Sequence, residues 1–153
     1  MNDRVMDPGT IVVRRVAADD IRALRHAVLR PGLPFDATRF EGDELDTTIH
    51  LAALVGTAVV GCASWMLSVF ADEPALQLRG MAVDPAWQGS GIGGRLLRHS
   101  EELFRDSPIT LRWCNARTSA VGFYERQGWT VVSPVFDIPT AGPHCRMTKR
   151  RPA

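Results

Sequence analysis

Four glycines crowd into the seven residues Gln-Gly-Ser-Gly-Ile-Gly-Gly from Gln88 to Gly94, and this segment constrains the fold more than any other. Each glycine costs about 1 kcal/mol relative to alanine inside a helix, so the segment predicts a turn. An apolar run over 76–83 precedes it, and a helical apolar pattern over 95–105 follows it. This order is typical of an anion site, because amides without Cβ atoms can approach a phosphate at a helix N-terminus. A flexible turn with a tight helix–strand contact is the alternative.

The rest of the chain alternates predicted strands with predicted helices. Alternating or β-branched apolar runs indicate strands, and apolar residues three and four positions apart indicate helices. The predicted strands are 10–16, 49–55, 58–69, 76–83, 110–114 and the final antiparallel pair 129–132 with 146–149. The predicted helices run from Asp19 or Asp20 to Leu29, over 95–105 with Leu96, Leu97, Leu103 and Phe104 inward, and over 119–127. Residues 31–47, rich in proline, glycine and acids, are expected to form a mobile loop with one short helix near 37–40.

Composition argues against several classes of protein. The 18 basic and 17 acidic residues give a net charge of +1, which provides no field for a polyanion, so nucleic acid is not an expected partner. No run approaches the roughly 18 apolar residues of a membrane span, and the first residues do not form an export signal. Three cysteines without a Cys-x-x-Cys pair predict reduced thiols in the cytoplasm. The histidines lack metal-ligand spacing, so no metal is expected.

Two cofactor motifs compete for the glycine-rich segment. Gly89 to Gly94 fits Gly-x-Gly-x-x-Gly, the fingerprint of dinucleotide-binding oxidoreductases. That fingerprint should open directly from its strand, with an acidic residue about 20 positions further on and a second mononucleotide-binding half. Here residues 84–87 intervene, Trp113 or Cys114 stands at the acidic position, and about 60 residues are left. The context therefore disfavours a dinucleotide.

The second motif, Gln/Arg-x-x-Gly-x-Gly/Ala, is met by Gln88, Gly91 and Gly93. The run Leu-Arg-Gly-Met-Ala-Val-Asp-Pro precedes it over 78–85. Further on, Ala-Val-Gly-Phe-Tyr-Glu-Arg-Gln-Gly-Trp over 120–129 fits the pattern Ala-x-x-Phe-Tyr-x-x-x-Gly-Phe, with tryptophan in the last aromatic place. Two motifs at this separation are far more specific than either alone.

With these two segments the chain resembles the GNAT acetyltransferase superfamily. The resemblance extends over roughly 10–149 in the order of elements and is strongest over 78–94 and 113–129. It implies an α/β (α+β) fold with a mixed, mostly antiparallel sheet flanked by helices and splayed between strands four and five. It also implies that 1–153 is a single acyl-CoA N-acyltransferase domain that uses acetyl-CoA and an amine substrate, and it allows a homodimer.

The resemblance also assigns roles to single residues. The Val83 amide would face the thioester carbonyl, Asn115 would bond the pantetheine chain, and Tyr124 would protonate the departing thiolate. The acetyl-CoA contacts that it implies are Met81, Val83, Gln88, Gly89, Ser90, Gly91, Ile92, Gly93, Gly94, Asn115, Phe123 and Tyr124. Thioester aminolysis builds negative charge on the carbonyl oxygen, where a fixed amide contributes several kcal/mol. Ordinary pKa values near 10 and 8.5 make proton transfer from tyrosine to thiolate uphill by about 2 kcal/mol. Core packing beside Phe123 is the alternative for Tyr124.

The acceptor side is specified poorly by the sequence. The candidate general bases are His50, His144, water and the carboxylates of the loop, which are Glu41, Asp43, Glu44 and Asp46. A structural role is more common for a lone histidine, and Cys114 and Cys145 are expected to be structural. The favoured function is transfer of an acetyl group from acetyl-CoA to a primary amine by direct attack. A nucleotide- or dinucleotide-binding oxidoreductase and a non-catalytic acyl-CoA sensor are the alternatives, and the sequence does not separate acetyl from longer acyl groups.

Overall fold

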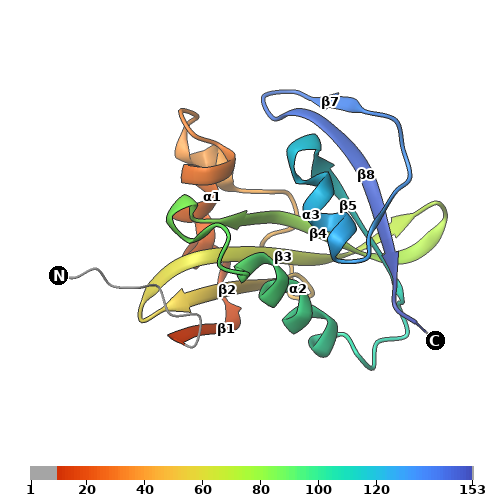
Figure 1. Ribbon diagram of the computed structural model, residues 1–153, viewed down its shortest axis with the longest axis horizontal. Helices are drawn as coiled ribbons and strands as arrows, with labels where there is room; N and C mark the ends of the chain where they lie inside the picture. Colours follow the sequence, from red (N-terminus) through yellow and green to blue (C-terminus); the bar gives the residue numbers. More distant parts are fainter. Residues whose placement is uncertain (1–9, 153) are drawn as a thin grey trace. The chain divides into compact units, whose positions relative to one another are not determined.

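The computed structural model describes residues 10–152, which form two compact units that share two long strands. The first unit holds the described residues up to Ser64 together with Gly80–Arg105, and the second holds Trp65–Arg79 and the described residues from Asp106 onward. The shared strands are β3 (Ala58–Phe70) and β4 (Glu73–Val83), which run as neighbouring long arrows in Figure 1. Each strand therefore contributes one part of its length to each unit.

In the first unit the strand order is β1-β2-β3-β4. Its other elements are β1 (Ile11–Val16), the 3-10 turn η2 (Ala18–Ile21), α1 (Arg22–Leu29), η3 (Phe35–Thr38), β2 (Ile49–Val55), η4 (Pro85–Trp87) and α2 (Ile92–Leu103). β1 and β2 are antiparallel, with Ile11 opposite Val55 and Val16 opposite His50. Because β1 lies at the edge of the sheet, its outward residues are polar or exposed, whereas β2 is buried along its centre.

Both faces of β2 are covered, which explains its nearly continuous apolar sequence. On one face, Ala52 and Leu54 pack with Ile21 and Leu24 from the α1 side. On the other face, α2 approaches so closely that a Cβ on Gly61 of β3 would lie 2.6 Å from Ile92 Cγ2, 3.2 Å from Leu96 Cδ1 and 3.4 Å from Ala53 Cβ. Glycine at position 61 is thus required by the contact between α2 and the sheet.

In the second unit the strand order is β3-β4-β5-β8-β6, and β7 pairs with β8. Its further elements are β5 (Leu111–Arg117), η5 (Thr118–Ala120), α3 (Val121–Arg126), β6 (Thr130–Val131), β7 (Phe136–Ile138) and β8 (Gly142–Arg150). β5 pairs antiparallel with β8 along its whole length. Part of β5 also pairs with β4, in parallel. The sheet is therefore mixed and mostly antiparallel, as the family resemblance implies.

The parallel pairing of β4 with β5 is short. It ends at Leu78 opposite Cys114, although β4 continues to Val83 and β5 to Arg117. Two residues past Leu78, Gly80 has a φ of +61°, a left-handed conformation that breaks the regular strand geometry and that glycine adopts without strain. The pairing of the fourth and fifth strands thus ends before either strand ends. None of the helices in the described part of the chain is long and apolar enough for a membrane crossing.

The helix predicted over 95–105 is displaced. It begins at Ile92, so Gly93 and Gly94 belong to its first turn in spite of their low helix propensity. The packing of Ile92 and Leu96 against the sheet overrides that propensity, since most helix stability in proteins comes from tertiary contacts. Leu103, expected to face inward, is 46% exposed because it ends the helix.

Other boundaries also differ from the prediction. β5 runs on to Arg117 because its full length pairs with β8. The short helix expected near 37–40 lies at Phe35–Thr38, directly after Pro34, where the Thr38 hydroxyl donates to the Phe35 carbonyl at 2.7 Å. β7 was not predicted, and β4 starts three residues earlier than expected, at Glu73.

Candidate active site

The glycine-rich connection between β4 and α2 is a series of tight turns with one open side. Asp84 Oδ1 accepts the amide of Ala86 at 2.9 Å and begins a short 3-10 turn. Gly89 and Gly91 then have φ values of +84° and +82°. Nothing lies within 4 Å of the point where a Cβ on either glycine would stand. The turn therefore offers its backbone to a ligand without steric cover.

α2 begins without a side-chain cap. Its N-cap is Gly91, which has no side-chain oxygen to accept the first amides, and no acidic residue stands in the first turn. The Gly91 carbonyl accepts a hydrogen bond from the amide of Arg95 at 3.0 Å, which is the first bond of the helix to its N-cap. The amides of the first turn of a helix have no carbonyl partner within it, and the helix dipole adds a partial positive charge there. This end of α2 suits a phosphate group.

The end of β4 is fixed by two further hydrogen bonds. The side chain of Gln88 donates through Nε2 to the Val83 carbonyl at 3.3 Å, and the amide of Asp84 donates to the Val60 carbonyl of β3 at 2.9 Å. Ala82 is buried in the α1-side core. Since side chains alternate along a strand, Met81 and Val83 point to the other face of β4 and are partly buried.

In the second unit, Tyr124 of α3 is buried among aromatic rings. Its ring centroid lies 5.1 Å from that of Phe123 and 5.5 Å from that of Trp129, both in edge-to-face geometry. Trp129 in turn lies 6.5 Å from Trp65. The amides of Gln127 and Trp129 both donate to the Tyr124 carbonyl, at 2.9 and 3.0 Å. The backbone and the ring of Tyr124 are thus both held in place.

The phenol of Tyr124 keeps its proton. Burial raises its pKa well above the usual value of 10, and Cys114 raises the pKa further. Burial also raises the pKa of the Cys114 thiol, to about 12. Because a donor with a raised pKa releases its proton less readily, transfer to a thiolate costs more than the roughly 2 kcal/mol derived from ordinary pKa values. The Tyr124 phenol is therefore neutral, and it would be only a weak acid.

The predicted site residues fall into two groups. Met81, Val83 and the segment 88–94 lie in the first unit, at the end of β4 and the start of α2. Asn115, Phe123 and Tyr124 lie in the second unit, on β5 and α3. Asn115 is exposed between the buried Cys114 and Ala116 and stands opposite Arg146 of β8.

The two candidate histidines differ in their hydrogen bonding. His50 Nε2 lies 2.9 Å from the Asp43 carbonyl and its Nδ1 lies 2.7 Å from Ser64 Oγ. Because a carbonyl only accepts, Nε2 carries the proton and Nδ1 accepts the serine hydroxyl, so both nitrogens of His50 are engaged. His144 Nδ1 lies 2.7 Å from the Gly142 carbonyl, which leaves Nε2 as the unprotonated nitrogen of the neutral ring.

The loop over 31–47 is tied to the first unit through α1. Asp43 is buried and pairs with Arg25 at 2.6 Å, and Glu44 pairs with Arg22 at 2.9 Å. The other two loop acids, Glu41 and Asp46, are exposed. Sequence reasoning missed Arg25, although it stands four residues after Ile21 and three before Val28, on the apolar face of the helix.

The three cysteines, Cys62, Cys114 and Cys145, are buried and form no disulfide. Burial raises the pKa of Cys62 to about 12 as well, and a protonated thiol is a poor nucleophile. Within residues 10–152 no group of three or more histidine, cysteine or acidic side chains is arranged to hold a metal ion.

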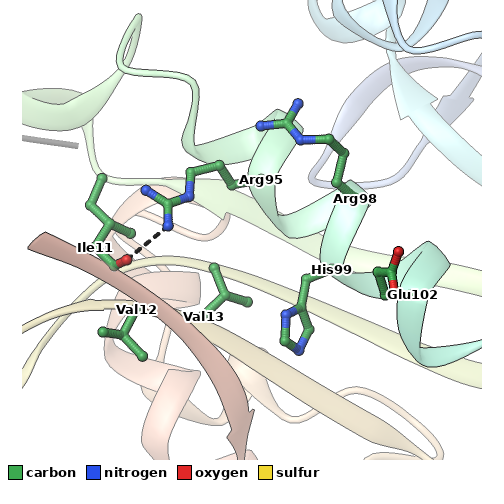
Figure 2. Close-up of a pocket in the computed structure, with 7 residues that line it drawn as sticks. All are labelled: Ile11, Val12, Val13, Arg95, Arg98, His99 and Glu102. Atoms are coloured by element: carbon green, nitrogen blue, oxygen red, sulfur yellow. Dashed lines mark hydrogen bonds between the residues drawn. The ribbon is translucent and has the colours of Figure 1, made fainter. Parts of the chain in front are cut away.

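A shallow groove of about 440 Å³ lies between α2 and the edge strand β1 (Figure 2). It is lined by Ile11, Val12, Val13, Arg95, Arg98, His99 and Glu102. The Arg95 guanidinium donates to the Ile11 carbonyl at 2.9 Å and so links α2 to the edge strand. None of the predicted site residues lines this groove.

Comparisons with known proteins agree on one family. A family model described as an acetyltransferase (GNAT) domain matches residues 46–131. The N-acetyltransferase YitI of Bacillus subtilis is 29% identical over 140 residues, which are 90% of this chain and 94% of that protein. The crystal structure of Escherichia coli ElaA has a TM-score of 0.76 at 19% identity, over 92% of this chain and 99% of that one. An aminoglycoside 6'-N-acetyltransferase in complex with coenzyme A has a TM-score of 0.73 at 15% identity, over 93% and 99%. At these identities the two structures show the fold alone.

Proposed function

The chain belongs to the GNAT acetyltransferase family and is an acetyl-CoA-dependent N-acetyltransferase, and we propose that it acetylates a primary amine by direct attack, with residues 10–149 as one catalytic domain. The observation that carries the proposal is the start of α2. There an uncapped helix N-terminus meets two glycines with open space on their Cβ side, inside the segment that the family model matches. Both features favour the binding of a phosphorylated ligand.

The pyrophosphate of acetyl-CoA would be held by the backbone amides from Gln88 to Gly94. This assignment is supported by the left-handed backbone of Gly89 and Gly91 and by the absence of a side-chain cap at the start of α2. Each charge-assisted hydrogen bond from a backbone amide to a phosphate oxygen is roughly twice as strong as a neutral one. Substrate binding therefore depends on the backbone and on small residues.

The amide of Val83 would stabilise the oxyanion that forms when an amine attacks the thioester carbonyl. An amide serves this purpose only if it is already in place, because reorientation during the reaction removes the benefit. Two observations support such preorganisation, namely the bond from Gln88 to the Val83 carbonyl and the bond from Asp84 to Val60. Met81, on the same face of β4, would contact the same substrate.

Tyr124 would donate the proton that the departing thiolate needs, and Asn115 and Phe123 would contact the pantetheine arm. The support for Tyr124 is its buried phenol, which burial keeps neutral, and its fixed backbone. Its raised pKa makes the phenol a weaker acid. Exclusion of water also disfavours the charged thiolate, so proton transfer from Tyr124 to the sulfur is favourable only where both groups are shielded from water.

A primary alkylamine must lose a proton before it attacks, which costs about 4.6 kcal/mol at pH 7. Among the candidate bases, His144 has the more suitable hydrogen bonding, because its Nδ1 donates to Gly142 and its Nε2 is the accepting nitrogen. We assign proton removal to His144, directly or through water. His50 is assigned a structural role.

The chain would also form a homodimer in the cytoplasm. Leu67 and Val69, two positions apart on β3, are 50% and 64% exposed, and adjacent exposed apolar side chains often mark a protein contact. The unpaired cysteines suit a reducing compartment. Light scattering coupled to size-exclusion chromatography measures the mass directly, and a monomer at micromolar concentration would overturn the dimer.

The acceptor is found by a screen of primary amines, including amino acids, polyamines and aminoglycosides, in which acetyl-CoA is the donor and release of the CoA thiol is measured. Family membership argues against the oxidoreductase alternative. Saturation with acetyl-CoA at 100 times its Kd should add about 2.7 kcal/mol of stability, while NAD should add none. Binding of acetyl-CoA without acetylation of any amine would support the sensor alternative.

A further inference from the structure

A buried hydrogen-bond network centres on Arg25 of α1, whose side chain is fully buried. Its Nη1 donates to the Thr38 carbonyl at 2.9 Å and to Asp43 Oδ2 at 2.6 Å. Its Nη2 donates to Asp43 Oδ1 at 3.2 Å and to Ser64 Oγ at 2.9 Å. The serine is bonded to His50, whose other nitrogen reaches the Asp43 carbonyl. One guanidinium thus joins α1, the loop and β3.

Such a network is a weak source of stability. Removing two charges from water costs several kcal/mol per ion, and well-packed apolar residues of similar volume often serve as well. The network therefore matters more for the groups that it holds in place than for the stability that its charges add. One atom of the guanidinium, Arg25 Nε, is buried without a hydrogen-bond partner, and its surroundings show what the side chain touches.

Arg25 Nε lies against Gly80 of β4. A Cβ on Gly80 would stand 3.0 Å from Arg25 Nε and 3.0 Å from Phe40 Cε2, closer than ordinary van der Waals contact. Phe40 itself is held by Arg25, since the guanidinium carbon lies 4.0 Å from the ring centroid and the Phe40 amide donates to Asp43 Oδ2 at 2.9 Å. Arg25 and Phe40 together form one wall against the Gly80 backbone.

Cys62 holds Gly80 through a different atom. Its Sγ donates to the Gly80 carbonyl at 3.4 Å, and burial raises the pKa of this thiol to about 12, so the donor proton stays in place. The backbone of Gly80 is thus fixed by a hydrogen bond at its carbonyl and by packing at its Cα. Its φ of +61° is a conformation that a residue with a side chain adopts only with strain.

Gly80 occupies a critical place in β4. It follows the last residue paired with β5, Leu78, and it precedes by three positions Val83, whose amide is assigned to the oxyanion. We propose that Arg25 is a positioning residue for acetyl transfer, which fixes the Gly80 backbone, and through it the Val83 amide, while it holds Phe40 beside that strand and pairs with Asp43. This inference rests on the proposed function, because the role of Val83 belongs to that function. Arg25 touches no reacting atom and acts through Gly80.

The chain offers a matched control one turn earlier in α1. Arg22 is also nearly buried, at 3% exposure, and it pairs with the exposed carboxylates of Asp19 and Glu44. The three atoms nearest to a Cβ on Gly80 belong to Arg25 and Phe40, and none belongs to Arg22. Substitution of Arg22 therefore disturbs a buried arginine and the same loop without disturbing Gly80.

The test compares Arg25→Lys with Arg22→Lys in the full chain. Lysine keeps the charge but lacks the planar fork that bonds two partners at once. We measure hydrogen–deuterium exchange of the amides over 80–83, the Kd of acetyl-CoA by calorimetry, and kcat and KM with the best amine from the screen. In Arg25→Lys, exchange over 80–83 should rise and kcat should fall by about tenfold or more, a factor that corresponds to 1.4 kcal/mol. The Kd of acetyl-CoA should stay within about twofold, because the α2 amides are unchanged.

In Arg22→Lys, exchange over 80–83 and kcat should both match the wild type. Wild-type exchange over 80–83 in Arg25→Lys, or an equal loss in the two variants, would overturn the positioning role. If Arg25→Lys does not fold, Asp43→Asn replaces it, because that change weakens the hold on Arg25 with little change in volume, and the same pattern is expected at smaller size. A wild-type protein that neither binds acetyl-CoA nor acetylates an amine would refute the proposed function, while the exchange comparison would still decide whether Arg25 holds Gly80.

Discussion

The ring of Tyr124 packs edge to face against that of Trp129 at 5.5 Å, and the Trp129 amide donates to the Tyr124 carbonyl at 3.0 Å. The two residues come from either side of Gly128, which follows the C-cap of α3 and has a φ of +93°. One turn of chain therefore fixes both the ring and the backbone of the proposed acid. Neither contact uses the Tyr124 hydroxyl, so a substitution that removes only the hydroxyl leaves the ring packing and the backbone hydrogen bond in place.

Tyr124→Phe removes the hydroxyl and keeps the ring packing. If Tyr124 protonates the thiolate, kcat should fall by about 10²–10⁴-fold, with little change in the Kd of acetyl-CoA or in thermal stability. The loss should shrink with acyl donors whose thiol is more acidic, since such a leaving group needs no proton. Steady-state kinetics with a matched series of thioesters check this, under conditions where chemistry limits turnover. Wild-type rates with every donor would assign the proton to water or to another group.

The pH profile follows from the raised pKa of Tyr124. Because burial keeps the phenol protonated beyond its usual range, the acid form of the enzyme is present at all pH values up to about 10. The profile of kcat/KM should therefore rise with pH as the amine and its base lose protons, and should then level off. A descending limb with a midpoint below pH 9 would show that the essential acid is a different group.

Asp43 links stability to pH. Burial alone raises its pKa, but the hydrogen bonds from Arg25 and from the Phe40 amide outweigh burial and hold the pKa below its usual value. The unfolded state then binds the proton more tightly than the folded state, so the contribution of Asp43 is present above about pH 4 and is lost as the pH falls further. Urea titrations from pH 3 to pH 7 should show a shallower pH dependence for Asp43→Asn than for the wild type. The exposed Asp46→Asn is the control, and equal slopes for Asp43→Asn and the wild type would contradict the linkage.

Local patterns were sufficient to predict most of the fold. Hydrophobic alternation located β1, β2 and β3, and the glycines at 89 and 91 located the turn before α2. The same reasoning failed where distant contacts decide the structure. Low helix propensity predicted that Gly93 and Gly94 lie outside α2. In the structure they belong to its first turn, because Ile92 packs against the sheet at Gly61.

At the candidate site, the roles of Tyr124 and the α2 amides stay predictions, although both could be named from short motifs in the sequence. The Arg25 network could not, because its partners Thr38, Asp43 and Ser64 lie 13, 18 and 39 positions away. Only the folded structure shows that the arginine on the apolar face of α1 forms an ion pair with a carboxylate from the loop.

The most direct test of the account is the Kd of acetyl-CoA for Gly91→Asp. The substitution places a carboxylate at the N-cap of α2, in open space where the phosphates are proposed to bind. Gly56→Asp is the matched control, because Gly56 also has a positive φ and an open Cβ side but lies in the hairpin between β2 and β3. Gly91→Asn keeps the size of the new side chain and omits its charge.

Calorimetry should give an acetyl-CoA Kd at least about tenfold weaker for Gly91→Asp, or 1.4 kcal/mol or more, with a smaller loss for Gly91→Asn and none for Gly56→Asp. Circular dichroism should show that all three proteins are folded. A folded Gly91→Asp protein that binds acetyl-CoA as the wild type does would contradict the assignment of the α2 N-terminus to the coenzyme phosphates.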